Sequence, residues 1–271
     1  MTLWLNGTLM PAEEARIAPS DRGFLLGDGV FETIRVIGGA PLHLGQHLAR
    51  LRFGASVLGI PVGWDDAELA EAIAAVAQAS GFGQAATRLT LTRGPAPRGV
   101  LPPSRPRPTL MISAGAMPPP APPAQAIIAT STRRNALSPL SRIKSLNYLD
   151  SIIARREAAE RGADEAILLD TSGHLAEATA ANLFLVMGNK VVTPPVADGA
   201  LPGIVRARLL EAGLAEEERL MPQDLASASA AFLTNSLGLR QLAKIEDREL
   251  KTEHPMLESI KRWHDTRKDP E

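Results

Sequence analysis

Residues 141–150 have the sequence SRIKSLNYLD, and residues 177–184 have the sequence EATAANLF. Lys144 stands among apolar residues in the first segment, and partial desolvation favours the neutral, nucleophilic form of an amine. Glu177 opens the second segment just before an apolar strand, where a buried carboxylate needs a charged or hydrogen-bonding partner. This lysine and this carboxylate, taken with their surroundings, decide the fold and the chemistry that the sequence predicts.

A reactive lysine and a buried acid are the two protein groups that pyridoxal 5'-phosphate (PLP) requires. The lysine forms a Schiff base with the aldehyde of the cofactor, and the acid keeps the ring nitrogen protonated so that the ring can accept electrons. Taken alone, a lysine before a helix is most often solvated, and an isolated glutamate is usually an ordinary surface charge. The choice between these interpretations depends on the sequence around them.

The surrounding segments resemble the fold type IV PLP enzymes. The similarity is carried by NYLDS at residues 147–151, GADEAILLD at 162–170 and the segment 177–184, and it extends from Asn6 to about Arg240. The family contains branched-chain aminotransferases, D-amino-acid aminotransferases and 4-amino-4-deoxychorismate lyases. The resemblance implies a mixed α/β (α+β) fold of two domains with PLP between them. It also implies a homodimer, because in this family the partner contributes the loop that selects the substrate.

Composition limits the alternatives. The chain has 271 residues, 45% of them hydrophobic, which is enough for one large or two modest cores. Its formal net charge of −1 gives no reason to expect nucleic acid or an anionic membrane as the main partner. The absence of cysteine excludes disulfides and thiolate metal sites. Residues 1–16 contain no apolar signal core and no run is long enough to span a bilayer, so we expect a cytoplasmic protein.

A proline-rich segment, MPPPAPP at residues 117–123, marks the expected domain boundary. Proline cannot continue a helix or a central strand, so this segment is typical of a stiff, extended linker. We therefore expect a smaller N-terminal domain at residues 1–116, a linker at 117–124 and a larger C-terminal cofactor domain at 125–271. A second segment rich in proline, glycine and arginine, residues 94–108, is expected to form a loop.

Hydrophobic periodicity predicts strands and helices in both expected domains. In the N-terminal domain these are strands at residues 3–5, 31–37, 89–92 and 109–113, and helices at about 44–58 and 66–79. In the C-terminal domain they are strands at 127–130, 167–169, 182–187 and 190–193, and helices at about 147–161 and 203–211. Gly188-Asn189 is expected to form a hairpin turn. The helix at 147–161 is expected to carry Tyr148, Leu149, Ile152 and Ile153 on one face.

The resemblance assigns cofactor-binding roles to residues in the two key segments. Lys144 is the Schiff-base lysine and the catalytic acid–base group, and Glu177 is the ligand of the ring nitrogen. Tyr148, the only tyrosine, occupies the position that bonds the phenolic oxygen of PLP in the branched-chain enzymes. Asn182 is expected to support the loop of Glu177. The alternative for Tyr148 is a core aromatic residue whose hydroxyl reaches the surface.

The phosphate of PLP has three expected anchors. An arginine in HLARL, residues 47–51, matches the family's phosphate-binding context, and a guanidinium offers paired donors and a permanent charge. The helix that Pro202-Gly203 opens has backbone N–H groups that can hold an anion. A polar turn after an apolar strand supplies the third anchor. The residues assigned to the phosphate are Arg50, Gly203, Ile204, Val205, Thr234 and Asn235.

The substrate is expected to contact Phe31 and the arginines of TRGPAPRG at residues 92–99. In the family this segment selects the substrate, and its arginines bind the carboxylates of lyase or D-amino-acid substrates. Arg93 and Arg98 are the corresponding residues here. Val100 departs from both patterns, because lyases usually have an aromatic residue after Arg-Gly and the D-amino-acid enzymes have a histidine. A solvated basic loop is the alternative interpretation for Arg93.

Two reactions of the family use the same lysine. The segments GDGVFETIR at residues 27–35 and FLTNSL at 232–237 look most like those of 4-amino-4-deoxychorismate lyases, which form 4-aminobenzoate and pyruvate. The alternative is a transaminase for D-amino acids or branched-chain L-amino acids with a 2-oxo acid acceptor. A catalytically silent binding protein on the same scaffold is a third interpretation.

Two other chemistries find little support in the sequence. His43 and His47 are spaced like metal ligands on one helical face, but no third ligand accompanies them, so no metal site is expected. Ser141 and Lys144 form a Ser-x-x-Lys motif, as in penicillin-recognising serine enzymes, but the Lys-Thr-Gly and Ser-Asp-Asn partners are absent. We therefore expect a PLP enzyme that acts on a small amino substrate.

Overall fold

The computed structural model describes residues 1–266, which form two compact units. Unit 1 contains Met1–Pro118 and the short segment Ile143–Asn147. Unit 2 contains Pro119–Arg142 and the described chain from Tyr148 onward. The first crossing from one unit to the other therefore falls inside the proline-rich segment. The segment that carries the predicted reactive lysine belongs to unit 1, although it follows the first part of unit 2 in the sequence.

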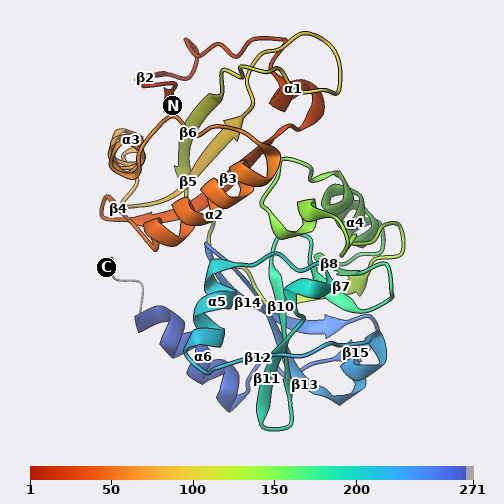
Figure 1. Cartoon of the computed structure of the whole chain (residues 1–271). Coiled ribbons are helices and arrows are strands. Elements are labelled where there is room, and N and C mark those ends of the chain that lie inside the picture. Colours follow the sequence, from red (N-terminus) through yellow and green to blue (C-terminus); the bar gives the residue numbers. More distant parts are fainter. Residues whose placement is uncertain (267–271) are drawn as a thin grey trace. The chain divides into compact units, whose positions relative to one another are not determined.

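Unit 1 is an antiparallel sheet covered by helices (Figure 1). Its strand order is β2-β1-β6-β5-β3-β4. The strands are β1 (Thr2–Leu5), β2 (Thr8–Pro11), β3 (Gly29–Ile37), β4 (Ala40–Pro41), β5 (Gln84–Thr92) and β6 (Thr109–Ala116). The helices are α1 (Arg22–Leu26), α2 (Leu44–Leu58) and α3 (Asp66–Ser80). Helix α2 packs on β3 and α3 packs on β6, so the core of the unit lies under these two helices.

Local sequence explains why these elements form. Along β3, Val30 and Ile34 are fully buried and join the core under α2, as the apolar pattern of the strand predicts. Helix α3 begins with a capping box, in which the side chains of Asp65 and Glu68 each accept the other residue's backbone N–H. It ends at Gly81, whose φ of 73° is a left-handed conformation that glycine adopts without steric cost.

Unit 2 is a mixed sheet with the order β12-β11-β10-β13-β14-β7-β8-β9, and β15 pairs with β14. Strand β9 also lies against β10, where Ala178 donates its N–H to the carbonyl of Ala181, so the sheet curls towards closure. The strands are β7 (Ala124–Ile128), β8 (Glu165–Leu169), β9 (Leu175–Ala178), β10 (Asn182–Met187), β11 (Lys190–Thr193), β12 (Glu216–Glu217), β13 (Ala228–Asn235), β14 (Gly238–Ile245) and β15 (Arg248–Glu249). The helices are η1 (Pro139–Arg142), α4 (Leu149–Glu160), η2 (Val196–Asp198), α5 (Ile204–Glu211), η3 (Pro222–Ser227) and α6 (Pro255–Thr266).

Helices α5 and α6 lie on one face of this sheet (Figure 1). They cover the stacked rings of Phe184 and Phe232, whose centroids are 4.8 Å apart. Helix α4 packs on β8 through its small residues Ala154 and Ala158, which are fully buried. The apolar face predicted for this helix is therefore not the face that packs on the sheet. Alanine allows the helix backbone to approach the strands closely, whereas Leu149 remains 72% exposed.

Each predicted strand and helix lies in or close to its expected range, whereas β2, β9, β14 and α6 were not predicted. The mixed α/β fold class is confirmed. The helix at 44–58 and the strands at 182–187 and 190–193 have the predicted bounds. The strand expected at 127–130 instead begins at Ala124 and ends at Ile128, and several other strands are longer than predicted. Among the described residues, no helix combines the length and the apolar character needed to cross a bilayer.

Candidate active site

Lys144 is held in unit 1 by backbone pairing with β3. The carbonyl of Lys144 accepts the N–H of Phe31 at 2.9 Å, and the N–H of Leu146 reaches the carbonyl of Gly29 at 2.9 Å. Beneath the lysine, Ile143 is buried in the core under α2. Ser145 also forms a bridge with Val30, so the backbone that follows the lysine is fixed against β3 and its side chain is presented from a rigid base.

The ring of Phe31 lies next to two cations. The Nζ atom of Lys144 is 4.4 Å from the ring centroid, and the Cζ atom of Arg88 is 3.8 Å from it. Both distances are within the range of cation–π attraction. Phe31, expected from the resemblance to contact the substrate, is buried and orients the predicted reactive amine. Arg88 lies on the neighbouring strand β5, and the sequence did not single it out.

A second residue that the sequence did not single out, Glu32, fixes Arg50. The carboxylate of Glu32 accepts hydrogen bonds from Arg50 Nε at 2.8 Å and Nη2 at 2.7 Å, and it lies 2.7 Å from His47 Nδ1. Burial alone would raise the pKa of Glu32, but the hydrogen bonds from Arg50 and His47 lower it below its ordinary value of 4.5. Arg50, the expected phosphate ligand, is therefore held by an ionised buried carboxylate.

His47 is a packed residue of this cluster. Burial lowers the pKa of His47 below its ordinary value of 6.5, although its hydrogen bond to Glu32 opposes the shift. The ring is therefore neutral at pH 7, and its contact with Glu32 is a hydrogen bond donated by Nδ1. His43 begins α2 in a left-handed conformation with φ 54°. His47 is therefore buried and packed against Glu32.

In unit 2, the carboxylate of Glu177 is buried and has polar partners on both of its oxygens. Its Oε2 accepts the N–H of Leu201 at 2.9 Å and lies 3.5 Å from Nδ2 of Asn182. Its Oε1 forms an ion pair with Nε of Arg134 at 3.1 Å. Arg134 also donates to the carbonyl groups of Gly199 and Ser141, so it is fixed on several sides. The sequence pointed to Glu177 and Asn182 but not to Arg134.

Asn182 links Glu177 to the start of α5. Its Nδ2 donates to the carbonyl of Leu201 at 2.9 Å, and its Oδ1 would lie only 2.0 Å from a Cβ atom placed at Gly203. Gly203 is the N-cap of α5 and has no side-chain cap, so the first N–H groups of the helix, beginning at Ile204 and Val205, are available to an anion. Glycine is required here because its backbone lies against the amide of Asn182.

Thr234 pairs with Asn182 across β10 and β13. It is 1% exposed, and its Oγ1 has no hydrogen-bond partner among the described residues. A buried hydroxyl without a partner is uncommon, and this one is left able to hydrogen-bond a bound group. Thr234 and the uncapped start of α5 thus offer an O–H and backbone N–H donors in one unit, and this donor set suits a phosphate.

Asn235 and Tyr148 are the other residues of unit 2 that are expected to contact the cofactor. The side chain of Asn235 shapes its own turn, with Oδ1 accepting the N–H of Leu237 at 2.9 Å, and its Nδ2 lies 3.4 Å from the carbonyl of Ala180. Tyr148 is the N-cap of α4, with φ −106° and ψ 10°, and makes no side-chain cap bond. It is partly buried.

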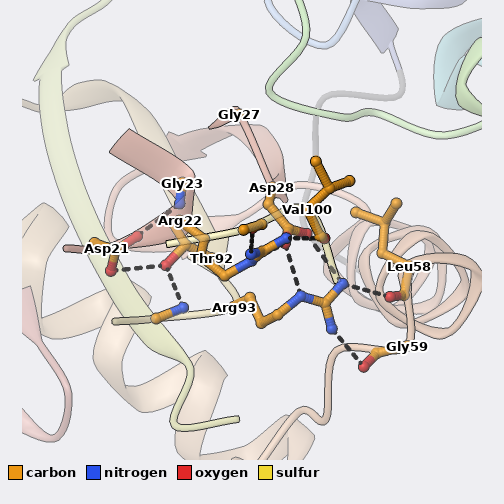
Figure 2. Close-up of polar contacts among 12 residues, drawn as sticks. Asp21, Arg22, Gly23, Gly27, Asp28, Leu58, Gly59, Thr92, Arg93 and Val100 are labelled. Atoms are coloured by element: carbon orange, nitrogen blue, oxygen red, sulfur yellow. Dashed lines mark hydrogen bonds and ion pairs between the residues drawn. The ribbon is translucent and has the colours of Figure 1, made fainter. Parts of the chain in front are cut away.

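The two arginines expected to bind substrate lie in different environments within unit 1. Figure 2 shows the guanidinium of Arg93 directed at the carboxylate of Asp28, with Nε–Oδ2 and Nη2–Oδ1 distances of 2.7 and 3.0 Å. Arg93 also donates to the carbonyl groups of Leu58 and Gly59. It is buried, and these contacts occupy most of its donors, so it holds the loop rather than reaching outward. Arg98 is exposed.

A separate group of ionisable side chains lies at the end of β8. Asp170, His174 and Asp198 place possible ligand atoms within 4.8 Å of one another. His174 Nδ1 lies 3.0 Å from Asp170, and Arg219 contacts both oxygens of Asp198. Asp170 also accepts the N–H groups of Ser172 and His174. These bonds give the group a structural role in the turn after β8.

Comparison with known proteins agrees with these features. The profile of the amino-transferase class IV family matches residues 29–245. The chain is 34% identical over 243 residues to a candidate branched-chain-amino-acid aminotransferase of Methanocaldococcus jannaschii, covering 87% of this chain and 84% of that protein. It is 31% identical over 256 residues to the D-alanine aminotransferase of Bacillus licheniformis, covering 87% and 85%. A solved structure of a candidate 4-amino-4-deoxychorismate lyase from Legionella pneumophila matches with a TM-score of 0.87 and 33% identity, over 95% of this chain and 97% of that one. The chain is therefore an enzyme of the class IV aminotransferase family.

Proposed function

We propose that this enzyme uses PLP, with Lys144 as the residue that holds the aldehyde carbon of the cofactor. The observation that carries the proposal is the rigid presentation of Lys144 beside Phe31, together with a buried carboxylate, Glu177, that Arg134 keeps paired. When bound, PLP supplies an electron sink for negative charge next to the amino-bearing carbon of the substrate. Glu177 would hold a proton at the ring nitrogen, which strengthens that sink.

The remaining cofactor contacts follow from the donors described above. The N–H groups at the start of α5 and the hydroxyl of Thr234 would bind the phosphate. The family resemblance implies that Arg50, held by Glu32, is a further ligand of the phosphate. Lys144, once the substrate amine has taken its place, would move a proton to or from the substrate carbon as an acid–base group. Tyr148 and Asn235 are proposed to complete the contacts, as the family resemblance implies.

For the reaction itself we propose 4-amino-4-deoxychorismate lyase activity. Removal of a proton by the amine of Lys144 would be followed by loss of pyruvate, and the remaining ring would become aromatic 4-aminobenzoate. The atoms of the two products add up to those of the substrate, so the reaction consumes no second substrate. Support comes from the segments at residues 27–35 and 232–237 and from the similarity to the Legionella pneumophila protein.

A transaminase is the second candidate, because the two relatives compared above carry transaminase names. In that case the substrate would be a D-amino acid or a branched-chain L-amino acid, and a 2-oxo acid would be needed as acceptor. Lys144 would serve both reactions, so the difference lies in the substrate contacts. We also propose that the enzyme is a homodimer, which is consistent with exposed apolar side chains on both units, including Phe24 and Leu149.

The test combines a lysine variant with a substrate panel. Purified enzyme loaded with PLP is expected to show a visible absorbance band from the bound cofactor and to release pyruvate from 4-amino-4-deoxychorismate without an added 2-oxo acid. Lys144→Ala should lose both properties. Lys190→Ala, which removes an exposed lysine paired with Glu216, should keep both. Activity with D-alanine or L-leucine that requires 2-oxoglutarate would favour the transaminase, and full turnover by Lys144→Ala would refute the role of the lysine.

A further inference from the structure

Arg22 joins two segments that are distant in the sequence. Its Nε lies 2.7 Å from Oδ2 of Asp28, its Nη1 donates to the carbonyl of Gly99 at 2.7 Å, and its Nη2 donates to the carbonyl of Val100 at 2.9 Å. These two carbonyl groups directly follow Arg98. One buried guanidinium thus holds the backbone just after the exposed arginine that is proposed to select the substrate.

Asp28 joins Arg22 to Arg93. Burial alone would raise the pKa of Asp28, but hydrogen bonds from Arg93 and then Arg22 lower it below its ordinary value of 3.8. The aspartate is therefore ionised at neutral pH and binds both guanidinium groups. Figure 2 shows this arrangement, with Arg22 and Arg93 directed at the same carboxylate.

Backbone contacts fix the beginning of the same loop. Arg22 donates its N–H to the carbonyl of Gly94, and Ala96 donates its N–H to the carbonyl of Ser20. Asp21, the N-cap of α1, accepts a hydrogen bond from the hydroxyl of Thr92 at 3.0 Å. Thr92 lies at the end of β5. The loop is therefore attached to the α1 segment at its start and again immediately after Arg98.

We infer that Arg22 is a positioning residue for substrate selection, which acts by holding the loop that carries Arg98. The inference rests on the proposed function, extended by the role that the resemblance implies for Arg98 as a ligand of the substrate carboxylate. Arg98 itself is exposed and points from a segment rich in proline and glycine, so its own surroundings do not fix it. A guanidinium is suited to the task, because its planar fork reaches two carbonyl groups and a carboxylate at once.

The loop sequence provides a readout that does not depend on activity. Trypsin cleaves after arginine but not before proline, and within residues 94–108 both Arg105 and Arg107 precede proline. Cleavage in this range can therefore occur only between Arg98 and Gly99. The rate of cleavage at that bond, followed by mass spectrometry on the PLP-loaded enzyme, measures how firmly the loop is held.

The variants are Arg22→Met, which keeps an unbranched stem, and Arg22→Lys, which keeps the charge but loses the fork. Each is expected to be cleaved at Arg98–Gly99 at least tenfold faster than the parent enzyme. The matched control is Arg52→Met, because Arg52 also pairs with a carboxylate, Asp66, and donates to a carbonyl, that of Trp64. It should leave this cleavage unchanged. The variant Arg98→Ala should abolish it, which identifies the bond.

The second readout is the concentration of amine that half-saturates the change in cofactor absorbance. For D-alanine this value should rise roughly tenfold in the Arg22 variants and by about 10- to 150-fold in Arg98→Ala, as expected when a charge-assisted contact is weakened or lost. For ethylamine, which lacks the carboxylate, it should stay within about twofold. Variants that keep the visible absorbance band of bound PLP and the thermal stability of the parent enzyme are folded.

The outcomes separate the inference from the proposed function. Unchanged cleavage in both Arg22 variants overturns the inference, because the loop is then held without Arg22. Faster cleavage with unchanged D-alanine saturation also overturns it, provided that Arg98→Ala still weakens D-alanine. If Arg98→Ala has no effect on D-alanine, the proposed role of Arg98 fails, and the selection role of Arg22 fails with it, while the cleavage result stands on its own.

Discussion

At the scale of single residues, the carboxylate of Glu177 depends on a cation that follows no sequence pattern. Arg134 lies before η1, and its Nε is 3.1 Å from Glu177 on β9. A buried carboxylate without a partner would be strongly destabilising, so this ion pair makes the buried position possible. The proposed contact with a protonated ring nitrogen places a second positive charge at this carboxylate.

We predict that Glu177→Gln lowers turnover while the enzyme still binds PLP. The amide can make a hydrogen bond at the ring nitrogen but carries no charge, and a charge-assisted bond is stronger than a neutral one by about 1.5 kcal/mol. This difference corresponds to a loss on the order of tenfold in kcat. Steady-state kinetics across the pH range and the absorbance of bound cofactor measure the two effects separately.

The matched control for Glu177→Gln is Asp198→Asn. Asp198 is also a buried carboxylate of unit 2 paired with an arginine, Arg219, and it has no proposed contact with PLP. Both variants should lose some stability, but only Glu177→Gln should have a lower turnover per molecule of bound cofactor. Equal kcat in Glu177→Gln and the parent enzyme at every pH would remove Glu177 from its proposed role.

At the scale of elements, the start of α5 is set by one close approach. The predicted helix after Pro202-Gly203 is confirmed and begins at Ile204. The structure adds that Gly203 lies against the side chain of Asn182, which itself contacts Glu177 and the carbonyl of Leu201. The proposed phosphate and ring-nitrogen contacts therefore share one supporting amide.

We predict that Gly203→Ala destabilises the protein and weakens PLP binding together. The new Cβ atom would lie 2.0 Å from Oδ1 of Asn182, so the amide or the helix start must move. Overpacking of this kind costs about 1–3 kcal/mol. Urea denaturation measures the free energy of unfolding, and titration with PLP measures the affinity for the cofactor.

Gly45→Ala is the matched control for this prediction. Gly45 lies in α2, and a Cβ atom there would meet nothing within 4 Å. Replacement of glycine by alanine at such a helical position should stabilise the protein by about 0.4–1 kcal/mol. If Gly203→Ala behaves like Gly45→Ala in both measurements, the contact with Asn182 does not constrain the start of α5.

At the scale of the whole molecule, buried ionisable groups make stability depend on pH. The pKa of His47 is below 6.5 in the folded protein because of burial, so the unfolded chain binds the additional proton first as the pH falls. Stability therefore rises with pH through this range and is lost on acidification below about pH 6.5. Burial raises the pKa of Glu32, but the hydrogen bonds from Arg50 and His47 lower it below its ordinary value of 4.5. Acidification below about pH 4.5 therefore causes a further loss of stability.

We predict that the free energy of unfolding falls as the pH drops below 6.5, and that His47 contributes up to about 1.4 kcal/mol per pH unit to this fall. Urea denaturation at pH 8, 6 and 5 measures this slope. His47→Gln, which can keep a hydrogen bond to Glu32 but does not titrate, should show a shallower slope between pH 6.5 and 5. An identical slope in the variant would show that His47 is not the group responsible.

The sequence by itself determined many of the local elements and pointed to the two residues that we propose for the chemistry. The bounds of α2, β10 and β11 follow from apolar periodicity and from the glycine and proline residues that end or begin each element. Lys144 and Glu177 follow from their segments, through the resemblance to a family that the comparisons then confirmed. These features are encoded within short stretches of chain, so they can be predicted without knowing what packs against them.

Only the tertiary structure decided which residues hold the key residues in place. Arg134 beside Glu177, Glu32 beside Arg50, and Arg22 beside the carbonyl groups after Arg98 are pairs whose members are far apart in the sequence. It also gave Arg93 an internal partner, Asp28, in place of a direct role in binding substrate. The physical reason is that these contacts depend on strand register and on the path of loops across the fold, and a local pattern of polar and apolar residues does not specify either.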